Sequence, residues 1–175
     1  MENLNINTER ILLFPLNLDQ LRFYLEDPER LEESLGIPVS SLINTEKLRR
    51  ALGMKIQKMG VADESDHVWY TYWLIVIRDT EFGAGMVGFK GLPNEKGEVE
   101  IGYGIDPDCQ GHGYMTEAVG TLIGWAFQQE SCRSVIAQYT NRLNVASNRV
   151  LEKVGMRVYR ETDEALSWRI DKKPS

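Results

Sequence analysis

A glycine-rich turn lies between a strand-like segment and a helix-like segment of this chain. The turn reads Gln110-Gly-His-Gly, and an apolar helix pattern begins directly after it. Backbone N–H groups at a helix N-terminus lack intrahelical partners and lie at the positive end of the helix dipole, and glycine admits an anion without a Cβ clash. Such a turn could cradle an anion, and a pyrophosphate is its natural ligand, but on spacing alone the favoured interpretation is that the glycines only allow a tight strand-to-helix turn.

The turn differs from two common nucleotide-binding motifs. No Gly-Lys-Ser or Gly-Lys-Thr sequence follows it, so it is not a P-loop. The third glycine of the dinucleotide-binding fingerprint is also absent. Both of these nucleotide-binding classes are therefore disfavoured.

Two glutamates on the segment before the turn could perform acid–base chemistry. Apolar residues alternate there with Glu98, Glu100, Gly102 and Gly104. Strand periodicity places both carboxylates on one face. A carboxylate in such a position could act as a general base. From the residues alone, solvated side chains on the surface of a strand are the preferred interpretation of both glutamates.

The elements that position these residues follow from the spacing of apolar residues. We expect strands over residues 10–16, 69–78, 83–92, 98–106 and 134–140, and a terminal hairpin of 156–160 with 166–170. We expect helices after Asn17, from Asn44 or Thr45, over 115–127 and from Asn144, with less regular structure between Pro28 and Pro38. The last helix should turn Ala146, Val150, Leu151 and Val154 inward.

The order of these elements indicates a mixed sheet in an α/β or α+β protein. Helices between strands in the second half favour crossover connections, whereas the middle hairpins are antiparallel. With 175 residues and no linker or repeat, the chain should form one domain over residues 1–175.

Composition and charge disfavour several functional classes. The net charge of −6 and the pI near 5.1 argue against nucleic acid and anionic membranes as partners. The apolar run 68–77 is shorter than the ~20 residues of a membrane span, and the N-terminus lacks a signal-peptide pattern. Cys109 and Cys132 form no CxxC or zinc-ligand pattern, so we expect no metal and a cytoplasmic location.

Two segments resemble motifs of one enzyme family. Gln110-Gly-His-Gly-Tyr-Met-Thr-Glu-Ala, after Ile105-Asp-Pro-Asp, resembles the Q/R-x-x-G-x-G/A cofactor motif of the GNAT superfamily of acetyl-CoA-dependent N-acyltransferases. Asn144-Val-Ala-Ser-Asn-Arg-Val-Leu-Glu-Lys-Val-Gly-Met resembles the N-x-x-S-x-x-V-L-E-K-x-G-F helix of its branch of ribosomal-protein N-terminal alanine acetyltransferases. The resemblance extends over about residues 8–169 and is tightest over 98–156.

This resemblance implies a particular fold. A GNAT domain has a central mixed, mostly antiparallel sheet of about seven strands, flanked by about four helices, with a core expected here over about residues 8–170. Two central strands, here 98–106 and 134–140, should separate in a V-shaped splay that admits the acetyl group.

The resemblance also implies acetyl-CoA as the acyl donor. Its pyrophosphate should bind the amides of the glycine turn, and its pantetheine arm should pair with residues 103–105. The implied cofactor-binding residues are Tyr103, Ile105, Gln110, Gly111, His112, Gly113, Tyr114, Met115, Thr116 and Asn144. Met115 replaces a small residue and is expected to crowd the phosphates slightly. Between residues 133 and 160, six basic residues and one acid give a local charge of +5, which suits an anionic cofactor or a solvated face.

The catalytic residues are less evident. Glu100 is the first candidate base, because some GNAT enzymes have a catalytic glutamate at the matching place, and Glu98 is the alternative. Many GNAT enzymes protonate the CoA thiolate with a tyrosine, but Leu151 stands at that position. Ser147 matches a serine thought to be the acid in the alanine-acetyltransferase branch, although it could instead only hydrogen-bond near Asn144.

The function implied by this resemblance is transfer of an acetyl group from acetyl-CoA to a primary amine. The amine would attack the thioester directly in a ternary complex. The acceptor could be a protein N-terminus or a small-molecule amine. The missing tyrosine keeps open a non-catalytic acyl-CoA-binding or sensing module. Dimers are common in the family, so a homodimer is one expected assembly.

Overall fold

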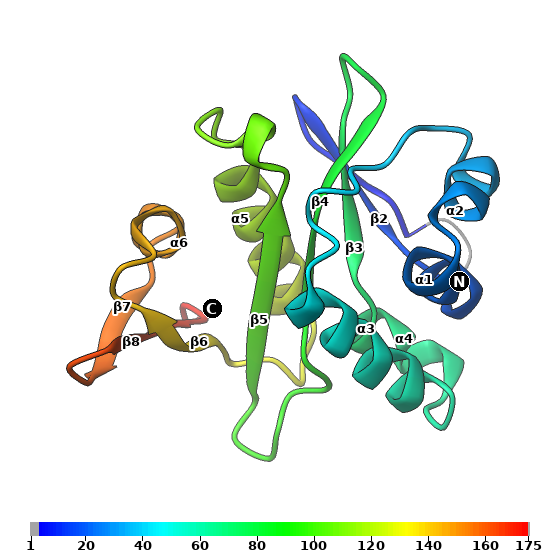
Figure 1. Ribbon diagram of the computed structural model, residues 1–175. Coiled ribbons are helices and arrows are strands. Elements are labelled where there is room, and N and C mark those ends of the chain that lie inside the picture. Colours follow the sequence, from blue (N-terminus) through cyan, green and yellow to red (C-terminus); the bar gives the residue numbers. More distant parts are fainter. Residues whose placement is uncertain (1–3, 175) are drawn as a thin grey trace.

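A single mixed sheet runs through the protein (Figure 1). The computed structural model describes residues 4–174. Over that range the strands are β1 (Ile6–Asn7), β2 (Ile11–Pro15), β3 (Trp73–Ile77), β4 (Phe82–Phe89), β5 (Glu98–Ile105), β6 (Ser134–Asn141), β7 (Arg157–Glu161) and β8 (Ala165–Asp171). Their order is β1-β2-β3-β4-β5-β6-β8-β7, and β5 with β6 is the parallel pair among antiparallel neighbours.

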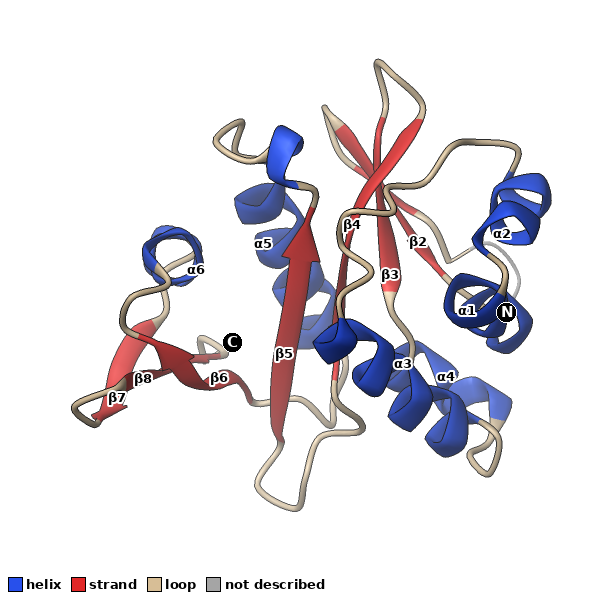
Figure 2. Cartoon of the chain, in the orientation of Figure 1, coloured by secondary structure: helices blue, strands red, loops and turns tan. Residues whose placement is uncertain are grey.

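Helices cover both faces of this sheet (Figure 2). Over the described range they are α1 (Leu18–Glu26), α2 (Pro28–Leu35), α3 (Glu46–Met59), α4 (His67–Tyr70), α5 (Tyr114–Gln128) and α6 (Val145–Lys153). The mixed α/β architecture with the splay is confirmed. Eight strands and six α-helices replace the expected seven and four, because β1, α2 and α4 are short additions. None of the described helices is both long and apolar enough to cross a bilayer.

Strand β3 separates two apolar cores because successive side chains point to opposite faces of a sheet. Trp73 and Ile75 pack with α5, and Leu74 and Val76 pack with α1, α2 and α3. A strand that is buried on both faces is continuously apolar, which explains its sequence, WLIVI. The two helical layers are therefore held to one sheet from opposite sides.

The splay lies between β5 and β6. These strands pair over three positions, and the last pair joins Glu100 to Ile136. Beyond it β6 pairs with β8 and β5 pairs with β4, so the two central strands diverge, as Figure 2 shows. The expected V-shaped opening is thus confirmed, and Glu100 lies at its apex.

Two expected segments were wrong. The stretch after Pro28 is helical: Asp27 caps it, Pro28 occupies its first turn, and Gly36 ends it in the left-handed conformation. The predicted strand over 69–78 begins only at Trp73, because Trp69 lies in α4. The ring of Trp69 packs against the aromatic core, and this tertiary contact outweighs its preference for a strand.

A lysine is buried between α3 and the sheet. The ammonium group of Lys55 donates hydrogen bonds to the carbonyls of Tyr70, Thr71 and Phe89, at 2.8, 3.3 and 2.5 Å. It also lies 4.3 Å from the centre of the Tyr72 ring. Lys55 thus joins α3 to the segments that flank β3 and β4, with its charge compensated by carbonyl oxygens.

We expect Lys55 to make stability depend on pH. Burial, with a smaller contribution from the charges of Lys58 and Lys90, lowers the pKa of Lys55 to about 7. The unfolded chain therefore binds more protons than the folded protein between pH 7 and 10, so this group makes the protein more stable as pH rises through that window. Relative to Lys55→Met, the unfolding free energy of the native protein should rise by about 1 kcal/mol per pH unit.

Denaturant titrations of both proteins at about pH 7, 8 and 9 would measure this difference. Parallel pH profiles would show that Lys55 has the same proton affinity in the folded and unfolded states.

Candidate active site

A cleft of about 330 Å³ opens where β5 meets the start of α5 and faces α6. One wall is formed by the end of β5 and the glycine turn, and the other by α6. The lining residues are Tyr103, Gly104, Ile105, Cys109, Gln110, Gly111, Gly113, Tyr114, Met115, Thr116, Asn144, Ala146, Ser147, Arg149, Val150 and Lys153. The two resemblance motifs, distant in the sequence, therefore form opposite walls of one cleft.

The glycine turn has a backbone that favours glycine. Gly111 and Gly113 have φ values of 78° and 82°, in the left-handed region that other residues rarely adopt. Gly113 is the N-cap of α5, and no side chain within residues 4–174 caps this end of the helix. The first N–H groups of α5 consequently stay available for an anion in the cleft.

Hydrogen bonds of Asp106 stabilise the segment that precedes the glycine turn. Asp106, at the end of β5, accepts a hydrogen bond from the backbone N–H of Asp108 at 2.8 Å. Its other carboxylate oxygen accepts one from the Ser40 hydroxyl at 2.5 Å. Asp106 and Ser40 are both buried. The loop between α2 and α3 is thus tied to the segment that leads into the glycine turn.

Nine of the ten predicted cofactor-binding residues line the cleft, and His112 does not. The His112 ring stacks on Tyr114 and lines a separate hollow together with Pro38 and Phe82. Met115 is mostly buried and packs in the core between α5 and the sheet, and it also contributes to the lining of the cleft.

Helix α6 presents the predicted face to the core, with one exception. Leu151 is buried, and Val150 and Val154 pack against the same core. Ala146 is the exception, because it is exposed and lines the cleft, so its predicted inward orientation was wrong. Arg149 and Lys153 also line the cleft and bring two positive charges opposite the glycine turn. The local basic excess in the sequence was the signal for these two residues. Leu151, which stands where many members of the resembling family have a tyrosine, is buried in the core and does not line the cleft.

A hydrogen bond spans the cleft between β5 and α6. The hydroxyl oxygens of Tyr103 and Ser147 are 2.9 Å apart. Burial raises the pKa of Tyr103 to about 12, against an opposing effect of the hydrogen bond to Ser147, so its hydroxyl keeps its proton at neutral pH. Asn144 caps α6 by accepting the backbone N–H of Ser147 at 3.1 Å. Asn144 thus contacts the backbone of Ser147 and not its side chain, and the Ser147 hydroxyl pairs with Tyr103.

The two glutamates of β5 lie outside the cleft, on the opposite face of the strand. Glu100 is paired with Lys90 at 2.5 Å and its side chain is 21% exposed. Glu98 forms an ion pair with Arg169. Hydrogen bonds from Arg169 and Asn94 lower the pKa of Glu98. Each glutamate is thus engaged in an ion pair. The two differ in position, because Glu100 stands at the apex of the splay and Glu98 lies two residues before it.

Lys90 and Arg169, the partners of these glutamates, were missed in the sequence. Lys90 follows β4 directly, and Arg169 lies in β8, 71 residues after Glu98. No spacing rule relates residues on different strands before their register is known. Only the order of strands brings these cations to the two carboxylates.

Comparison with known proteins shows which family and which relatives this chain resembles. The family model of the acetyltransferase (GNAT) domain matches residues 10–157. The uncharacterized N-acetyltransferase YjdG of Bacillus subtilis is 33% identical over 96 residues, which are 55% of this chain and 56% of that protein. The chain spans about half the length of the curated relatives it matches.

Solved structures share the architecture. The ribosomal-protein-S5-alanine acetyltransferase of Vibrio fischeri is 18% identical, with a TM-score of 0.65, covering 98% of this chain and 100% of that one. The RimL ribosomal L7/L12 alpha-N-protein acetyltransferase, solved in complex with coenzyme A, is 14% identical with a TM-score of 0.65 and covers 95% and 97% of the two chains. At these identities the likeness establishes the fold.

Proposed function

This chain belongs to the GNAT acetyltransferase family, and on this premise we propose that it transfers an acetyl group from acetyl-CoA to a primary amine. One observation carries the proposal: the uncapped N-terminus of α5 opens into a cleft beside the point where β5 and β6 separate. An anion cradle and a gap in a sheet together suit a long cofactor with phosphates at one end and a reactive thioester at the other.

In this proposal the glycine turn binds the pyrophosphate of acetyl-CoA. The N–H groups of residues 111–116 donate to the phosphate oxygens, and Arg149 and Lys153 supply opposing positive charge. The end of β5, from Tyr103 to Ile105, has no partner on its β6 side and offers backbone groups to the pantetheine arm. Asn144 contacts the cofactor from the start of α6.

Acetyl transfer then takes place at the apex of the splay. Glu100 accepts a proton from the attacking amine, directly or through water, and the free amine attacks the thioester carbonyl carbon. The carbon–sulfur bond breaks, and the leaving sulfur receives the proton of the Ser147 hydroxyl, which Tyr103 orients. The proton that the acylated nitrogen releases as the amide forms passes through water to Ser147 and restores its hydroxyl. Glu100 and the cleft lie on opposite faces of β5, so donor and acceptor can be bound together.

The state of Cys109 supports direct transfer over an acyl-enzyme. Its thiol lines the cleft, where a covalent intermediate could form. However, burial raises the pKa of Cys109, and the charges of Asp106 and Asp108 raise it further. Since the thiolate is the nucleophilic form, these neighbours make Cys109 a poor acyl acceptor at neutral pH.

We propose a protein N-terminal amine as the acceptor. Two solved structures of the same fold are named ribosomal-protein acetyltransferases, and this supports the choice. The Ser147 motif in α6 resembles that branch as well. Small-molecule amines serve as the comparison in the test.

The first test is calorimetric titration of acetyl-CoA, with NAD and ATP as controls. Selective binding near micromolar affinity, about −8 kcal/mol, is expected. Release of CoA thiol should then be followed with N-terminal peptides and with small amines. Turnover with small amines alone would overturn the proposed acceptor, and cofactor binding without turnover on any amine would indicate a binding module. No binding by folded protein would refute the function.

Ser147→Ala should lower kcat about tenfold, because the CoA sulfur loses its proton donor. Acetyl-CoA affinity should change little, since Asn144 caps α6 through the backbone of residue 147. Tyr103→Phe removes the orienting hydroxyl and should have a smaller effect on kcat. Steady-state kinetics with acetyl-CoA and acceptor varied separately would measure both. An unchanged kcat in Ser147→Ala would exclude Ser147 as the acid.

A further inference from the structure

The turn between β1 and β2 contacts the glycine turn and the start of α5 through the side chains of Thr8 and Arg10. The Arg10 guanidinium donates from Nη1 to the His112 carbonyl at 2.8 Å and from Nε to the Glu117 carboxylate at 2.7 Å. The Thr8 hydroxyl donates to the same carboxylate at 2.5 Å. One short turn near the N-terminus therefore contacts both the glycine turn and the first part of α5, more than 100 residues later in the chain.

The contact with His112 determines how the next peptide group is oriented. No peptide bond within residues 4–174 is cis, and in a trans peptide the C=O and N–H groups point in opposite directions. A His112 carbonyl held toward Arg10 turns the N–H of Gly113 away from Arg10. Gly113 lines the cleft, whereas the His112 side chain does not. We propose that Arg10 is a positioning residue that holds the glycine turn in its pyrophosphate-binding conformation.

Arg10 also balances a charge that would oppose an anionic ligand. Glu117 lies in the first part of α5, close to where the proposed pyrophosphate binds. Its carboxylate pairs with Arg10 at 2.6 Å. Burial alone would raise the pKa of Glu117, but hydrogen bonds from Thr8 and Arg10 outweigh this effect and lower it. The ionised carboxylate is thus neutralised by Arg10 rather than left to repel phosphate.

The turn that carries Arg10 is itself anchored. The Arg78 guanidinium, just after β3, donates to the Thr8 carbonyl at 2.8 Å and to the Glu9 carbonyl at 3.3 Å. Figure 1 shows the β1–β2 turn and the start of α5 at the same edge of the molecule. Arg10 therefore acts from a fixed backbone, as a positioning residue must.

Arg10→Lys separates the contact with the glycine turn from the ion pair. A lysine can keep the pairing with Glu117, but its single ammonium lacks the fork that reaches Glu117 and His112 together. We expect the Kd and KM for acetyl-CoA to rise about tenfold, with kcat and the acceptor KM within about twofold. Thermal denaturation should show a nearly unchanged Tm. A purely structural role for Arg10 would change Tm without this selective rise in KM.

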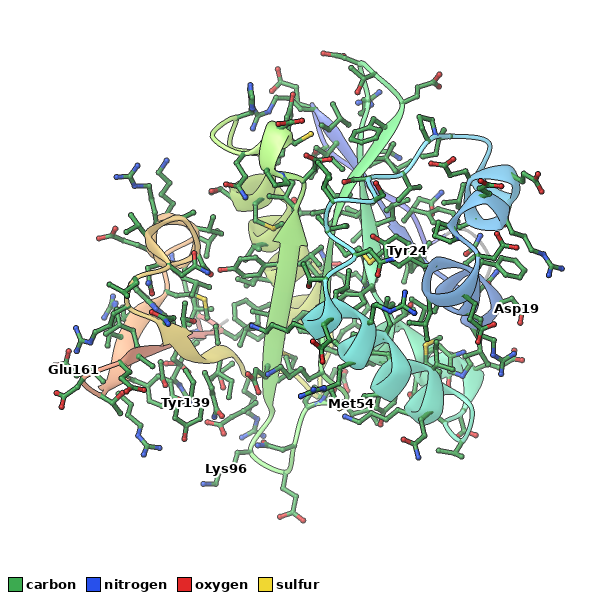
Figure 3. The ribbon with its side chains drawn as sticks, in the orientation of Figure 1. Asp19, Tyr24, Met54, Lys96, Tyr139 and Glu161 are labelled. Carbon is green, nitrogen blue, oxygen red and sulfur yellow. The ribbon has the colours of Figure 1, made fainter. Side chains whose placement is uncertain are left out.

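Two controls complete the experiment. Arg78→Ala loosens the same β1–β2 turn without removing a contact to the glycine turn. Its Tm should fall below that of Arg10→Lys, and its Kd for acetyl-CoA should rise less than the Kd of Arg10→Lys. Arg22→Ala removes an exposed arginine that pairs with Asp19 on α1, on the far side of the molecule from α6 (Figure 3), and should change neither.

The inference rests on the proposed function, and calorimetry distinguishes the two failures. If the native protein does not bind acetyl-CoA, the proposed function fails and the role of Arg10 fails with it. If the native protein and Arg10→Lys bind acetyl-CoA with equal affinity and equal KM, the role of Arg10 is overturned and the proposed function stands.

Discussion

Acetyl-CoA binding by Gly113→Val is expected to be weaker than native binding by about 100-fold or more. Gly113 has a φ of 82°, where a β-branched residue is strained. An added Cβ would also stand 3.3 Å from Nη2 of Arg10. Relief of both strains requires rotation of the peptide groups around residue 113, which misaligns the N–H donors proposed for the pyrophosphate. Loss of two charge-assisted hydrogen bonds accounts for the magnitude.

Titration calorimetry on protein shown to be folded by circular dichroism measures this effect. Gly113→Ala should bind better than Gly113→Val, because alanine tolerates the left-handed region more readily. Gly124→Ala is the matched control: Gly124 lies within α5, and a Cβ there would meet nothing within 4 Å. It should keep full affinity and gain about 0.5–1 kcal/mol of stability. Native affinity in folded Gly113→Val would show that the glycine turn is no phosphate cradle.

The second large effect is expected for Glu100→Gln. An isosteric amide cannot accept the amine proton, so kcat/KM for the acceptor should fall by about 100- to 10,000-fold. Acetyl-CoA affinity should remain native, because Glu100 lies outside the cleft. The residual rate should increase with pH as free amine becomes available without a base. Kinetics between about pH 6 and 10, with calorimetry for the cofactor, would test both expectations.

Glu98→Gln provides the matched control, since Glu98 lies on the same face of β5 and also forms an ion pair, but stands two residues before the apex of the splay. The catalytic rate of Glu98→Gln should stay within about threefold of native. Loss of the ion pair with Arg169 should appear as a modest decrease in stability. If Glu98→Gln abolishes activity while Glu100→Gln does not, the roles assigned to the two carboxylates are reversed. Similar native rates in both variants would exclude a carboxylate base from β5.

Local patterns were sufficient to predict the parts of the site that local backbone geometry creates. Gly111 and Gly113 signalled a tight turn before an apolar helix, and Asn144 signalled the start of α6. These features depend on contacts between residues a few positions apart, so their residue types carry the information. The caps of α2, Asp27 and Gly36, carried the same kind of signal, but the flanking prolines led to a prediction of irregular structure there.

Tertiary packing decided the placement and burial of residues that local patterns left open. Trp69 has the composition of a strand residue, yet α4 carries it into the aromatic core. Ala146 fitted the apolar stripe of α6, yet it lines the cleft because Leu151 takes the buried position. Burial depends on what lies opposite a helix, and the helix sequence does not contain that information.

The sequence by itself determined the glycine turn before α5, the capped second motif, the mixed sheet and the family resemblance, because each depends on short-range backbone preferences or on a contiguous motif. Only the tertiary structure decided that Glu100 stands at the apex of the splay. It also decided that Tyr103 hydrogen-bonds Ser147 and that Arg10 donates to the His112 carbonyl. Those contacts join residues from different strands and helices. Strand order and register create them, and both are properties of the folded sheet as a whole.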